Sequence, residues 1–412
     1  MERVILHCDL NCFFASVELL SHPELRHLPV AVCGDPTTRH GIILAKNEHA
    51  KRKGVKTAET IWQAQRKCPE LVLLPAHREP YKQYSKLVNA IYARYTDLVE
   101  PFGIDESWLD VTGSLHLFHK SPKELADEIR ETVKRELGLT LSVGVSFNKV
   151  FAKLGSDYKK PDATTVITEE NFRGIVWPLP VTDLLYVGRA AASLLKKYDV
   201  TTIGGLAQFD RETLALLLGK QGGQLHDYAN GIDRSAVKPA GFHEPPKSVG
   251  NGITFRRNLL GEDDIRTGVA LIADSVAGRL RRYGLKCTTL QVTIRDPNFK
   301  DICRQRPLPA PTYVSRDLIA CAMGLIIDSW DVNKAPIRAL TLTGLNLLPE
   351  SEAAEQLDLF SAAEPHKRDK REDLEKAMDA IRQKFGKEAI RSARGMDSDV
   401  VHEREPEEES KP

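Results

Sequence analysis

The sequence predicts several α+β domains, the first of them with helices on one side of a mostly antiparallel sheet. Three observations indicate this class. The chain has 412 residues, and single hydrophobic cores stop growing near roughly 250 to 300 residues. Residues 1–167 alternate strand and helix patterns. Beyond them, a glycine-punctuated helical block and a second strand-helix block are separated by a proline-bearing linker.

The first block opens with a short apolar strand, RVILHC, and the helix CFFASVELL follows at residues 12–20. Residues 81–99 carry a helical apolar stripe. Residues 121–138 form a further helix, which Ser121 and Glu124 delimit as a capping box. The segment LTLSVGVSF then alternates as a strand with one buried face does.

The later blocks differ in composition. Residues 11–74 interrupt the first domain with a basic, weakly patterned piece, and residues 168–233 are helical. The stretch HEPPKS, residues 243–248, is typical of an interdomain linker. Strands and helices alternate after it, and apolar content thins from residue 349 onward.

Charge and cysteine content exclude some classes of protein. No apolar run approaches the roughly 20 residues that cross a bilayer, and the N-terminus does not resemble a secretory signal, so we expect a cytoplasmic protein without membrane contact. Seven scattered cysteines without a CxxC pair indicate neither a zinc site nor a disulfide framework. Residues 243–346 hold 15 Lys and Arg against 10 Asp and Glu, whereas residues 347–412 hold 12 against 18. A basic module followed by an acidic tail suits a nucleic-acid binder, although such an excess also fits a solvated surface.

Three carboxylates stand at the ends of apolar strands. Asp9 ends the first strand, and Asp105 with Glu106 interrupts the stretch VEPFGIDESWLDVTG. Each could be a cap or turn residue. Adjacent like charges in a partly dry site, however, are paired with cations or lose ionisation. Mg²⁺ takes hard oxygen ligands, and a two-metal site serves phosphoryl transfer.

The segments HCDLNCFFASVE, GIDESWLDVTGS, SVGVSFNKVFAKLGSDYKKPD and KSVG resemble the signature segments of Y-family, lesion-bypass DNA polymerases, and most closely the bacterial DNA polymerase IV family. The similarity runs in order over about residues 3–346. It implies a right-hand polymerase with a palm, small fingers, a helical thumb and an α/β little finger. The implied boundaries are palm 1–10 and 75–167, fingers 11–74, thumb 168–233, linker 234–244, little finger 245–346 and acidic tail 347–412.

The resemblance also implies roles for individual residues. Asp9, Asp105 and Glu106 correspond to the family's catalytic, metal-binding carboxylates, with two Mg²⁺ ions per site, and the backbone carbonyl of Leu10 gives a further ligand. Phe14 corresponds to the steric gate, an aromatic face that leaves no room for a 2′-hydroxyl. The nucleotide-binding set is Phe13, Lys51 and Lys160.

The fingers segment AKNEHAKRKGVK departs from the family pattern. Glu48 and Lys51 stand where the family commonly has a tyrosine and an arginine that hold the triphosphate. Lysine meets phosphate as a point charge without the bidentate fork of arginine, and a glutamate should repel phosphate. The sequence therefore predicts weaker nucleotide binding, or a Glu48 turned away toward Lys46 or Arg52.

Residues outside the palm are expected to contact DNA. The thumb segment LLYVGRAAASLL resembles a helix-hairpin-helix with Gly188 in its turn, although Tyr186 replaces the family's first glycine; a plain helical hairpin is the alternative. In the little finger, Arg256, Arg257 and Arg282 are expected to grip template phosphates. Further basic candidates there are Arg279, Arg281, Lys286 and Arg295.

The acidic tail carries two apolar patterns. Gln356, Leu357, Leu359 and Phe360 in EQLDLF resemble the short motif by which bacterial polymerases bind the sliding clamp. Farther on, an amphipathic helix is expected to pack back on the protein or on a partner. Its apolar stripe is Leu374, Met378, Ile381 and Phe385.

The sequence thus predicts a monomeric, Mg²⁺-dependent, template-directed DNA polymerase of low fidelity. It would add dNTPs to a primer 3′-hydroxyl on primer-template DNA, act in translesion synthesis and lack proofreading. Two alternatives come from other classes. One is a catalytically silent Y-family paralogue acting as a DNA-damage adaptor, which should lack some of the carboxylates. The other is a nucleotidyl cyclase with a palm-like domain, which would have no use for a thumb or a clamp motif.

Overall fold

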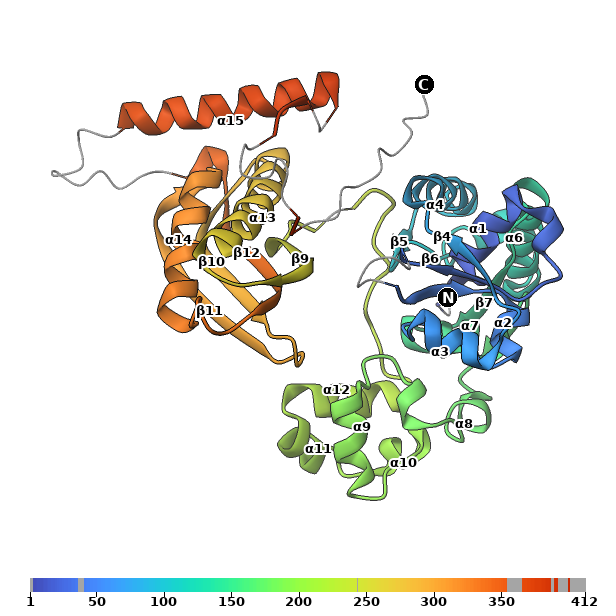
Figure 1. Cartoon of the computed structure of the whole chain (residues 1–412). Coiled ribbons are helices and arrows are strands. Elements are labelled where there is room, and N and C mark those ends of the chain that lie inside the picture. The colour runs from blue at the N-terminus through green and yellow to red at the C-terminus, as the bar shows by residue number, and fades with distance from the viewer. Residues whose placement is uncertain are drawn as a thin grey trace. The chain divides into compact units, whose positions relative to one another are not determined.

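The computed structural model describes residues 3–35, 41–242, 244–353, 365–386, 389–391 and 399–400, with side chains from Lys370 onward in the last helix. The described residues up to Phe242 form one compact unit and those from Glu244 form a second (Figure 1). Within the described part of the chain, no helix is both long enough and apolar enough to cross a membrane.

The first unit is built around a five-stranded sheet, the palm sheet, in the order β5-β6-β1-β7-β8. The central strand β1 pairs antiparallel with β6 and β7, while β7 and β8 run parallel. In the register of β1 and β6, Asp9 lies opposite Glu106. The strands are β5 (Val99–Pro101), β6 (Glu106–Asp110), β1 (Ile5–Leu10), β7 (Leu141–Ser146) and β8 (Thr164–Ile167).

Helices cover both faces of the palm sheet, so the prediction of helices on one side only was wrong. Alternate strand residues point to opposite faces. Leu6 and Leu109 face a core shared with α1 (Phe13–Ser21), α4 (Arg78–Tyr92) and α6 (Pro122–Leu137). On the other face, His7 contacts α7 (Lys149–Tyr158) through Ser156. The sequence pattern missed this arrangement because β1 is buried throughout and shows no alternation.

Two glycines let α7 lie directly on the sheet. A Cβ atom added at Gly144 of β7 would come 1.9 Å from the backbone oxygen of Ala152, and one added at Gly155 would come 3.0 Å from the Cα of Gly144. Neither approach is possible with a larger side chain unless the helix shifts. The close packing lowers the helix onto the carboxylate-bearing face of β1.

A second, smaller sheet has the order β3-β2-β4, and we call it the fingers sheet. Its core is formed with two short helices, of which α3 begins at a capping box made by Thr60 and Gln63. The elements are η1 (Pro23–Leu25), β2 (Val30–Cys33), β3 (Ile43–Lys46), α2 (Glu48–Arg52), α3 (Ile61–Lys67) and β4 (Val72–Pro75).

The remainder of the first unit is helical and packs into its own core together with Phe151 and Phe172. These helices lie in the region predicted as the thumb (Figure 1). Their bounds are α8 (Phe172–Ile175), η2 (Val181–Asp183), α9 (Arg189–Lys196), α10 (Ile203–Gln208), α11 (Arg211–Leu218) and α12 (Lys220–Ala229). One further short helix, α5 (Leu115–Phe118), lies apart from them and packs against the core of the palm sheet.

The second unit holds a four-stranded antiparallel sheet, the little-finger sheet, in the order β11-β10-β12-β9. Two long helices, α13 and α14, form a common core with it. The elements are β9 (Ser248–Leu259), α13 (Glu262–Arg282), β10 (Leu285–Arg295), β11 (Asp301–Thr312), α14 (Ser315–Ser329), β12 (Ile337–Pro349) and η3 (Glu350–Glu352).

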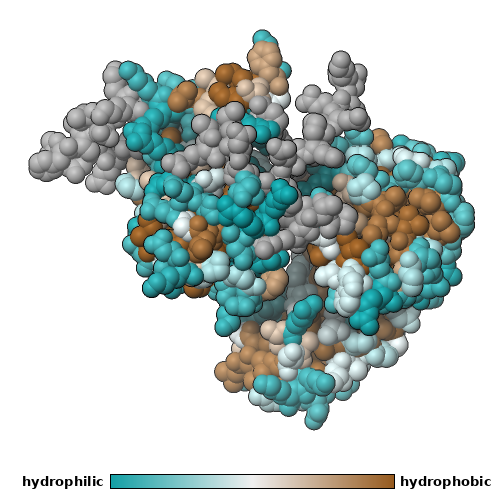
Figure 2. Space-filling model, in the orientation of Figure 1, coloured by the Kyte–Doolittle hydropathy of each residue, from teal (hydrophilic) through white to brown (hydrophobic). Residues whose placement is uncertain are grey.

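The last helix, α15 (Pro365–Phe385), packs on the second unit through charged residues. Glu375 and Asp379 pair with Arg281 at 2.6 and 2.5 Å. Of the two predicted positions for the apolar stripe, packing back on the protein is wrong, because Leu374 and Phe385 are 60% and 65% exposed, whereas packing on a partner stays a prediction. Figure 2 shows apolar surface where Figure 1 draws α15. Ion pairs hold the helix in place, with its apolar residues turned outward.

Candidate active site

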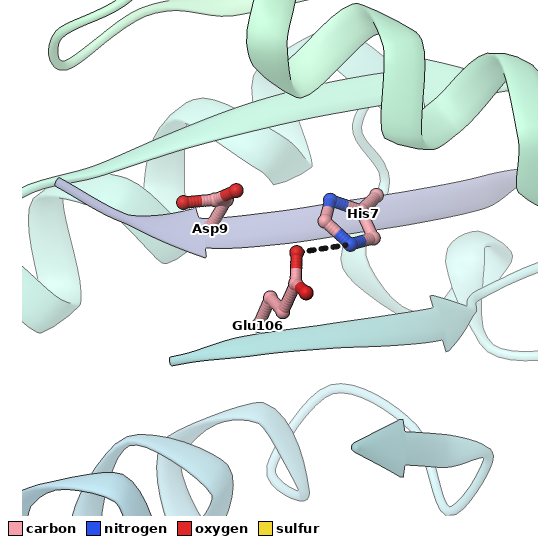
Figure 3. A group of neighbouring side chains, drawn as sticks. All are labelled: His7, Asp9 and Glu106. Carbon is pink, nitrogen blue, oxygen red and sulfur yellow. Dashed lines mark ion pairs between the residues drawn. The ribbon is translucent and has the colours of Figure 1, made fainter. Parts of the chain in front are cut away.

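The carboxylates of Asp9 and Glu106 lie where β1 and β6 pair (Figure 3). Asp9 is 8% exposed. His7 precedes it by two positions on the same strand and therefore points to the same face. One ligand atom from each of His7, Asp9 and Glu106 lies within 4.8 Å of the others. His7 was not among the residues predicted from the sequence, although its spacing from Asp9 was the signal that could have identified it.

Asp105 lies in the turn just before β6, where its backbone oxygen accepts a hydrogen bond from Leu10 N at 3.0 Å. Burial raises the pKa of the Asp105 carboxyl from 3.8 to about 6, and the negative charges of Asp9 and Glu106 add to the shift. The three acids therefore act on one another electrostatically. A bound cation would relieve this repulsion.

Two lysines reach these carboxylates from α7 and the residues after it. Lys153 Nζ lies 3.1 Å from Asp9 Oδ2 and 2.5 Å from Glu106 Oε2. Lys160 Nζ lies 2.9 Å from the same Asp9 oxygen. Burial lowers the pKa of the Lys153 ammonium, but the neighbouring carboxylates, Asp9 first, outweigh burial and raise this pKa overall. Lys153, which lies within α7, was not singled out from the sequence.

A cavity of about 390 Å³ opens beside the carboxylates and is also lined by residues of the fingers sheet. The Phe14 ring stacks on the Tyr81 ring, with centroids 4.2 Å apart and planes 9° apart. Phe13 is 3% exposed and belongs to the palm core, yet it contributes to the cavity wall. The cavity brings together Phe13, Phe14, Lys51, Lys160 and the three acids of the sequence prediction. It adds Cys12, Lys46 and Thr57, which the sequence analysis did not propose as cavity residues.

Glu48 stays in the cavity wall rather than turning away to Lys46 or Arg52. Its Oε1 lies 3.4 Å from Lys51 Nζ and accepts a hydrogen bond from the thiol of Cys12 at 3.5 Å. Lys46 instead donates to the hydroxyl of Thr57 at 2.9 Å. Burial lowers the pKa of the Lys46 ammonium. The charge of Lys51 is thus partly neutralised by Glu48, whereas Lys46 lines the cavity and is bonded to a neutral hydroxyl.

The thumb turn holds Tyr186 in a backbone conformation that glycine favours. Tyr186 adopts a left-handed conformation with φ of 72°, which favours glycine, so the side chain is held there at the cost of strain. Gln221 Nε2 donates to the Tyr186 backbone oxygen at 3.1 Å. Gly188 is the N-cap of α9, and a Cβ added there would meet nothing within 4 Å.

The basic residues of the second unit are of two kinds. Arg256 and Arg282 are exposed. Arg257 pairs with Asp264 and with Asp399, the latter at 2.8 Å. Lys286 pairs with Glu372 of α15 at 2.8 Å. The expected clamp motif at Gln356, Leu357, Leu359 and Phe360 lies outside the described residues.

Comparison with solved structures identifies the fold. The chain aligns with a Y-family DNA polymerase chimera of Dbh and Dpo4 at a TM-score of 0.74, with 19% identity over 84% of this chain and 99% of the other. This similarity shows the fold, which is that of a Y-family DNA polymerase. The right-hand polymerase architecture predicted from the sequence is confirmed.

Comparison of sequences narrows the class to a family. Residues 8–157 match the impB/mucB/samB family model, and residues 246–359 match that of its C-terminal domain. The chain is 48% identical to "DNA polymerase IV" of Acetivibrio thermocellus over 391 residues, covering 95% of this chain and 97% of the relative. It is 38% identical to "DNA polymerase IV 1" of Bacillus subtilis over 390 residues, covering 95% and 92%. The chain belongs to the DNA polymerase IV family and is a DNA-directed DNA polymerase, a membership that implies DNA binding and use of a divalent metal.

Proposed function

We propose that this polymerase is Mg²⁺-dependent, works at low fidelity without proofreading, and adds dNTPs to a primer 3′-hydroxyl during translesion synthesis in the cytoplasm. The observation that carries the proposal is that three carboxylates line one cavity. Asp9 and Glu106 lie opposite each other in the register of β1 and β6, and Asp105 precedes Glu106. A carboxylate cluster beside a space for a triphosphate is what phosphoryl transfer with divalent metals requires.

The donor set fits two Mg²⁺ ions. Asp9, Asp105 and Glu106 offer hard oxygen atoms, and Leu10 adds a backbone carbonyl in the same cavity wall. The raised pKa of Asp105 and the lysine contacts to Asp9 and Glu106 both indicate a surplus of negative charge that a divalent ion would balance. Bound there, the metal would activate the primer hydroxyl and stabilise the leaving pyrophosphate.

The other cavity residues would hold and select the nucleotide. Phe14, fixed by its stacking on Tyr81, would exclude a 2′-hydroxyl and so favour deoxynucleotides. Lys160, Lys51 and Phe13 would bind the nucleotide, with Lys160 released from Asp9 to meet the triphosphate.

We further propose the domain boundaries given above: palm 1–10 and 75–167, fingers 11–74, thumb 168–233, little finger 245–346. Arg256, Arg257 and Arg282, together with the turn at Gly188, would contact primer-template DNA, and the protein would act as a monomer. The segment from Gln356 to Phe360 would bind a sliding clamp; loss of clamp-stimulated synthesis after Leu359→Ala with Phe360→Ala tests that contact.

Primer extension by the purified full chain with Mg²⁺ tests the central claim. Wild type should extend a primer, and Asp105→Ala combined with Glu106→Ala should abolish extension. Glu136→Gln, which changes a surface carboxylate paired with Arg94, is the matched control and should keep full activity. Undiminished extension by the double variant would refute the assigned site. No extension by wild type would favour the silent adaptor, and cyclisation of a nucleoside triphosphate without a primer would favour the cyclase.

A further inference from the structure

The loop of residues 159–163, which we call the lysine loop, joins α7 to β8 and carries Lys160. Lys160 Nζ lies 2.9 Å from Asp9 Oδ2 and 2.8 Å from Asp157 Oδ1. Lys160 also lines the cavity beside the carboxylates. Because lysine is a point charge on a flexible stem, the place that its ammonium can reach depends on how firmly the loop holds its backbone.

Arg130 of α6 grips the lysine loop from the side of that helix. Its Nη2 atom donates to the backbone oxygen of Asp162 and, at 2.7 Å, to Oδ1 of the same residue. Its Nη1 atom donates to Asp127 Oδ1 at 2.9 Å. The Arg130 side chain is only 13% exposed. One guanidinium thus binds both the main chain and the side chain of a residue that lies two positions after Lys160.

Further contacts fix both partners of Arg130. The hydroxyl of Thr164, the first residue of β8, donates to Asp127 Oδ1 at 2.6 Å, and Lys134 Nζ lies 3.1 Å from Asp162 Oδ2. Burial alone would raise the pKa of the Asp162 carboxyl, but the hydrogen bonds from Arg130 and Lys134 outweigh burial and lower this pKa. Asp162 is therefore ionised at neutral pH and available to the guanidinium.

The backbone of Asp162 is itself unusual. It is left-handed, with φ of 51°. Asp and Asn take this conformation more readily than other residues that have a side chain, and it persists where the surrounding structure enforces it. The helix α7 therefore fixes one end of the lysine loop, and Arg130 fixes the turn near the other end.

We propose that Arg130 is a positioning residue for the incoming nucleotide: through Asp162 it holds the lysine loop so that Lys160 can meet the triphosphate. Arg130 does not line the cavity, so it acts through the loop and not by contact with the substrate. The inference rests on the proposed function, which assigns Lys160 to the triphosphate. The same contacts would also join α6 to β8 in a purely structural role, and the experiment has to separate the two roles.

Single-nucleotide insertion by the full chain with Mg²⁺ tests the inference. Arg130→Lys keeps the charge but loses the fork that binds Asp162 and Asp127 together. The KM for dNTP should rise about five- to tenfold, while kcat changes less than about twofold. Lys160→Ala should raise KM at least as much, and adding Arg130→Lys to it should have no further effect. An unchanged KM in Arg130→Lys, or effects of the two substitutions that multiply, would overturn the inference.

Two variants of Asp162 approach the contact from the loop. Asp162→Asn keeps an oxygen for the guanidinium and tolerates the left-handed backbone, so KM should stay within about twofold of wild type. Asp162→Gly also tolerates that backbone but removes the carboxylate, and KM should rise about as much as in Arg130→Lys. Equal KM values in the two variants would refute the role of the contact. This pair still decides should Arg130→Lys fail to fold, as judged by circular dichroism.

Arg94→Lys is the matched control. Arg94 binds Glu136 of α6 with two parallel hydrogen bonds of 2.8 and 2.9 Å, but it is 54% exposed and its partner lies outside the lysine loop. Its KM should equal that of wild type, and a rise as large as in Arg130→Lys would overturn the inference. If Lys160→Ala leaves KM unchanged, the proposed role of Lys160 fails as well. If Lys160→Ala raises KM and Arg130→Lys does not, that role stands and only positioning by Arg130 is refuted.

Discussion

Charge is arranged in opposite ways in the palm and in the little finger. In the palm, three carboxylates share a partly buried cluster. Burial, and after it the negative charges of Asp9 and Glu106, raise the pKa of Asp105 to about 6. In the little finger, the Arg281 side chain is 5% exposed and pairs with Glu375 and Asp379 of α15. Charge that a protein leaves unbalanced is available to a ligand, whereas charge that it has already balanced supports the fold. The two regions therefore need different experiments.

The largest effect is expected when the buried ion pairs of Arg281 in the little finger are broken. Arg281→Ala leaves the Glu375 side chain, which is 10% exposed, without a cation and with only its hydrogen bonds from Ser315, and breaking a buried pair costs about 3 to 5 kcal/mol. We expect the free energy of unfolding of this unit to fall by about 3 kcal/mol. Hydrogen exchange in urea, followed on peptides from β10 and β12, measures it without requiring the whole chain to unfold in one step.

Arg256→Ala is the counterpart, because this arginine is exposed in the same unit. Its loss should leave the unfolding free energy within about 0.5 kcal/mol. Primer-template affinity should weaken a few-fold, and the slope of log affinity against log salt should drop by about one. If Arg281→Ala lowered only DNA affinity and Arg256→Ala lowered only stability, the contrast between paired and exposed arginines would be wrong.

The same contrast explains how much could be read from the sequence. The paired acids at 105 and 106 and the helix caps at 121 and 138 are local signals, so the fold class and the carboxylates could be predicted. Lys153 joins the site because the Gly144 contact lowers α7 onto β1, a distant packing event with no local signature. His7, in contrast, lies two residues before Asp9 on β1, a local spacing that the prediction did not use. The pairing of Lys286 with Glu372 spans 86 residues, so a count of charges overstated the basic surface.

The second prediction concerns the sugar side of the cavity. Phe14→Ala removes the ring that would exclude a 2′-hydroxyl, and ribonucleotide incorporation relative to deoxynucleotide should rise on the order of a hundredfold. Single-nucleotide insertion kinetics with both sugars measure it. Tyr81→Leu, which removes the stacking partner at 4.2 Å, should give an intermediate rise because the Phe14 ring can then move. Tyr81→Phe keeps the stacked ring, although it loses the hydrogen bond to Glu18, and should keep the sugar selectivity of wild type. Equal selectivity in all variants would remove Phe14 from the assigned role.

The third prediction concerns the side of the cavity that would hold the triphosphate, where Glu48 pairs with Lys51. Glu48→Gln removes a carboxylate that pairs with Lys51 at 3.4 Å and would face the triphosphate. The apparent KM for dNTP should fall about three- to tenfold, with a smaller change in kcat. Glu48→Tyr, which restores the usual family residue, should lower KM as well.

A double-mutant cycle with Lys51→Ala separates direct repulsion from release of the lysine. If the gain comes from freeing Lys51, Glu48→Gln should have no effect in the Lys51→Ala background. A KM that is unchanged in both Glu48 variants would show that the carboxylate does not oppose the nucleotide.

The smallest effect is expected from the repulsion among the palm carboxylates, which can be measured through the pH dependence of stability. Burial, then Asp9 and Glu106, raise the pKa of Asp105 from 3.8 to about 6, so between these values the folded protein holds a proton that the unfolded chain has lost. The Asp105 contribution to stability is therefore full below pH 4 and is lost as pH rises through 6.

In metal-free buffer with a chelator, Asp105→Asn should be more stable than wild type at pH 7 by on the order of 1 kcal/mol, and this gain should vanish near pH 4. Urea unfolding of both proteins at the two pH values measures the difference; a gain of the same size at both would mean that the acids do not repel one another as the structure indicates. Saturating Mg²⁺ at pH 7 should reverse the order, because the wild-type carboxylate then has a cation and the amide does not.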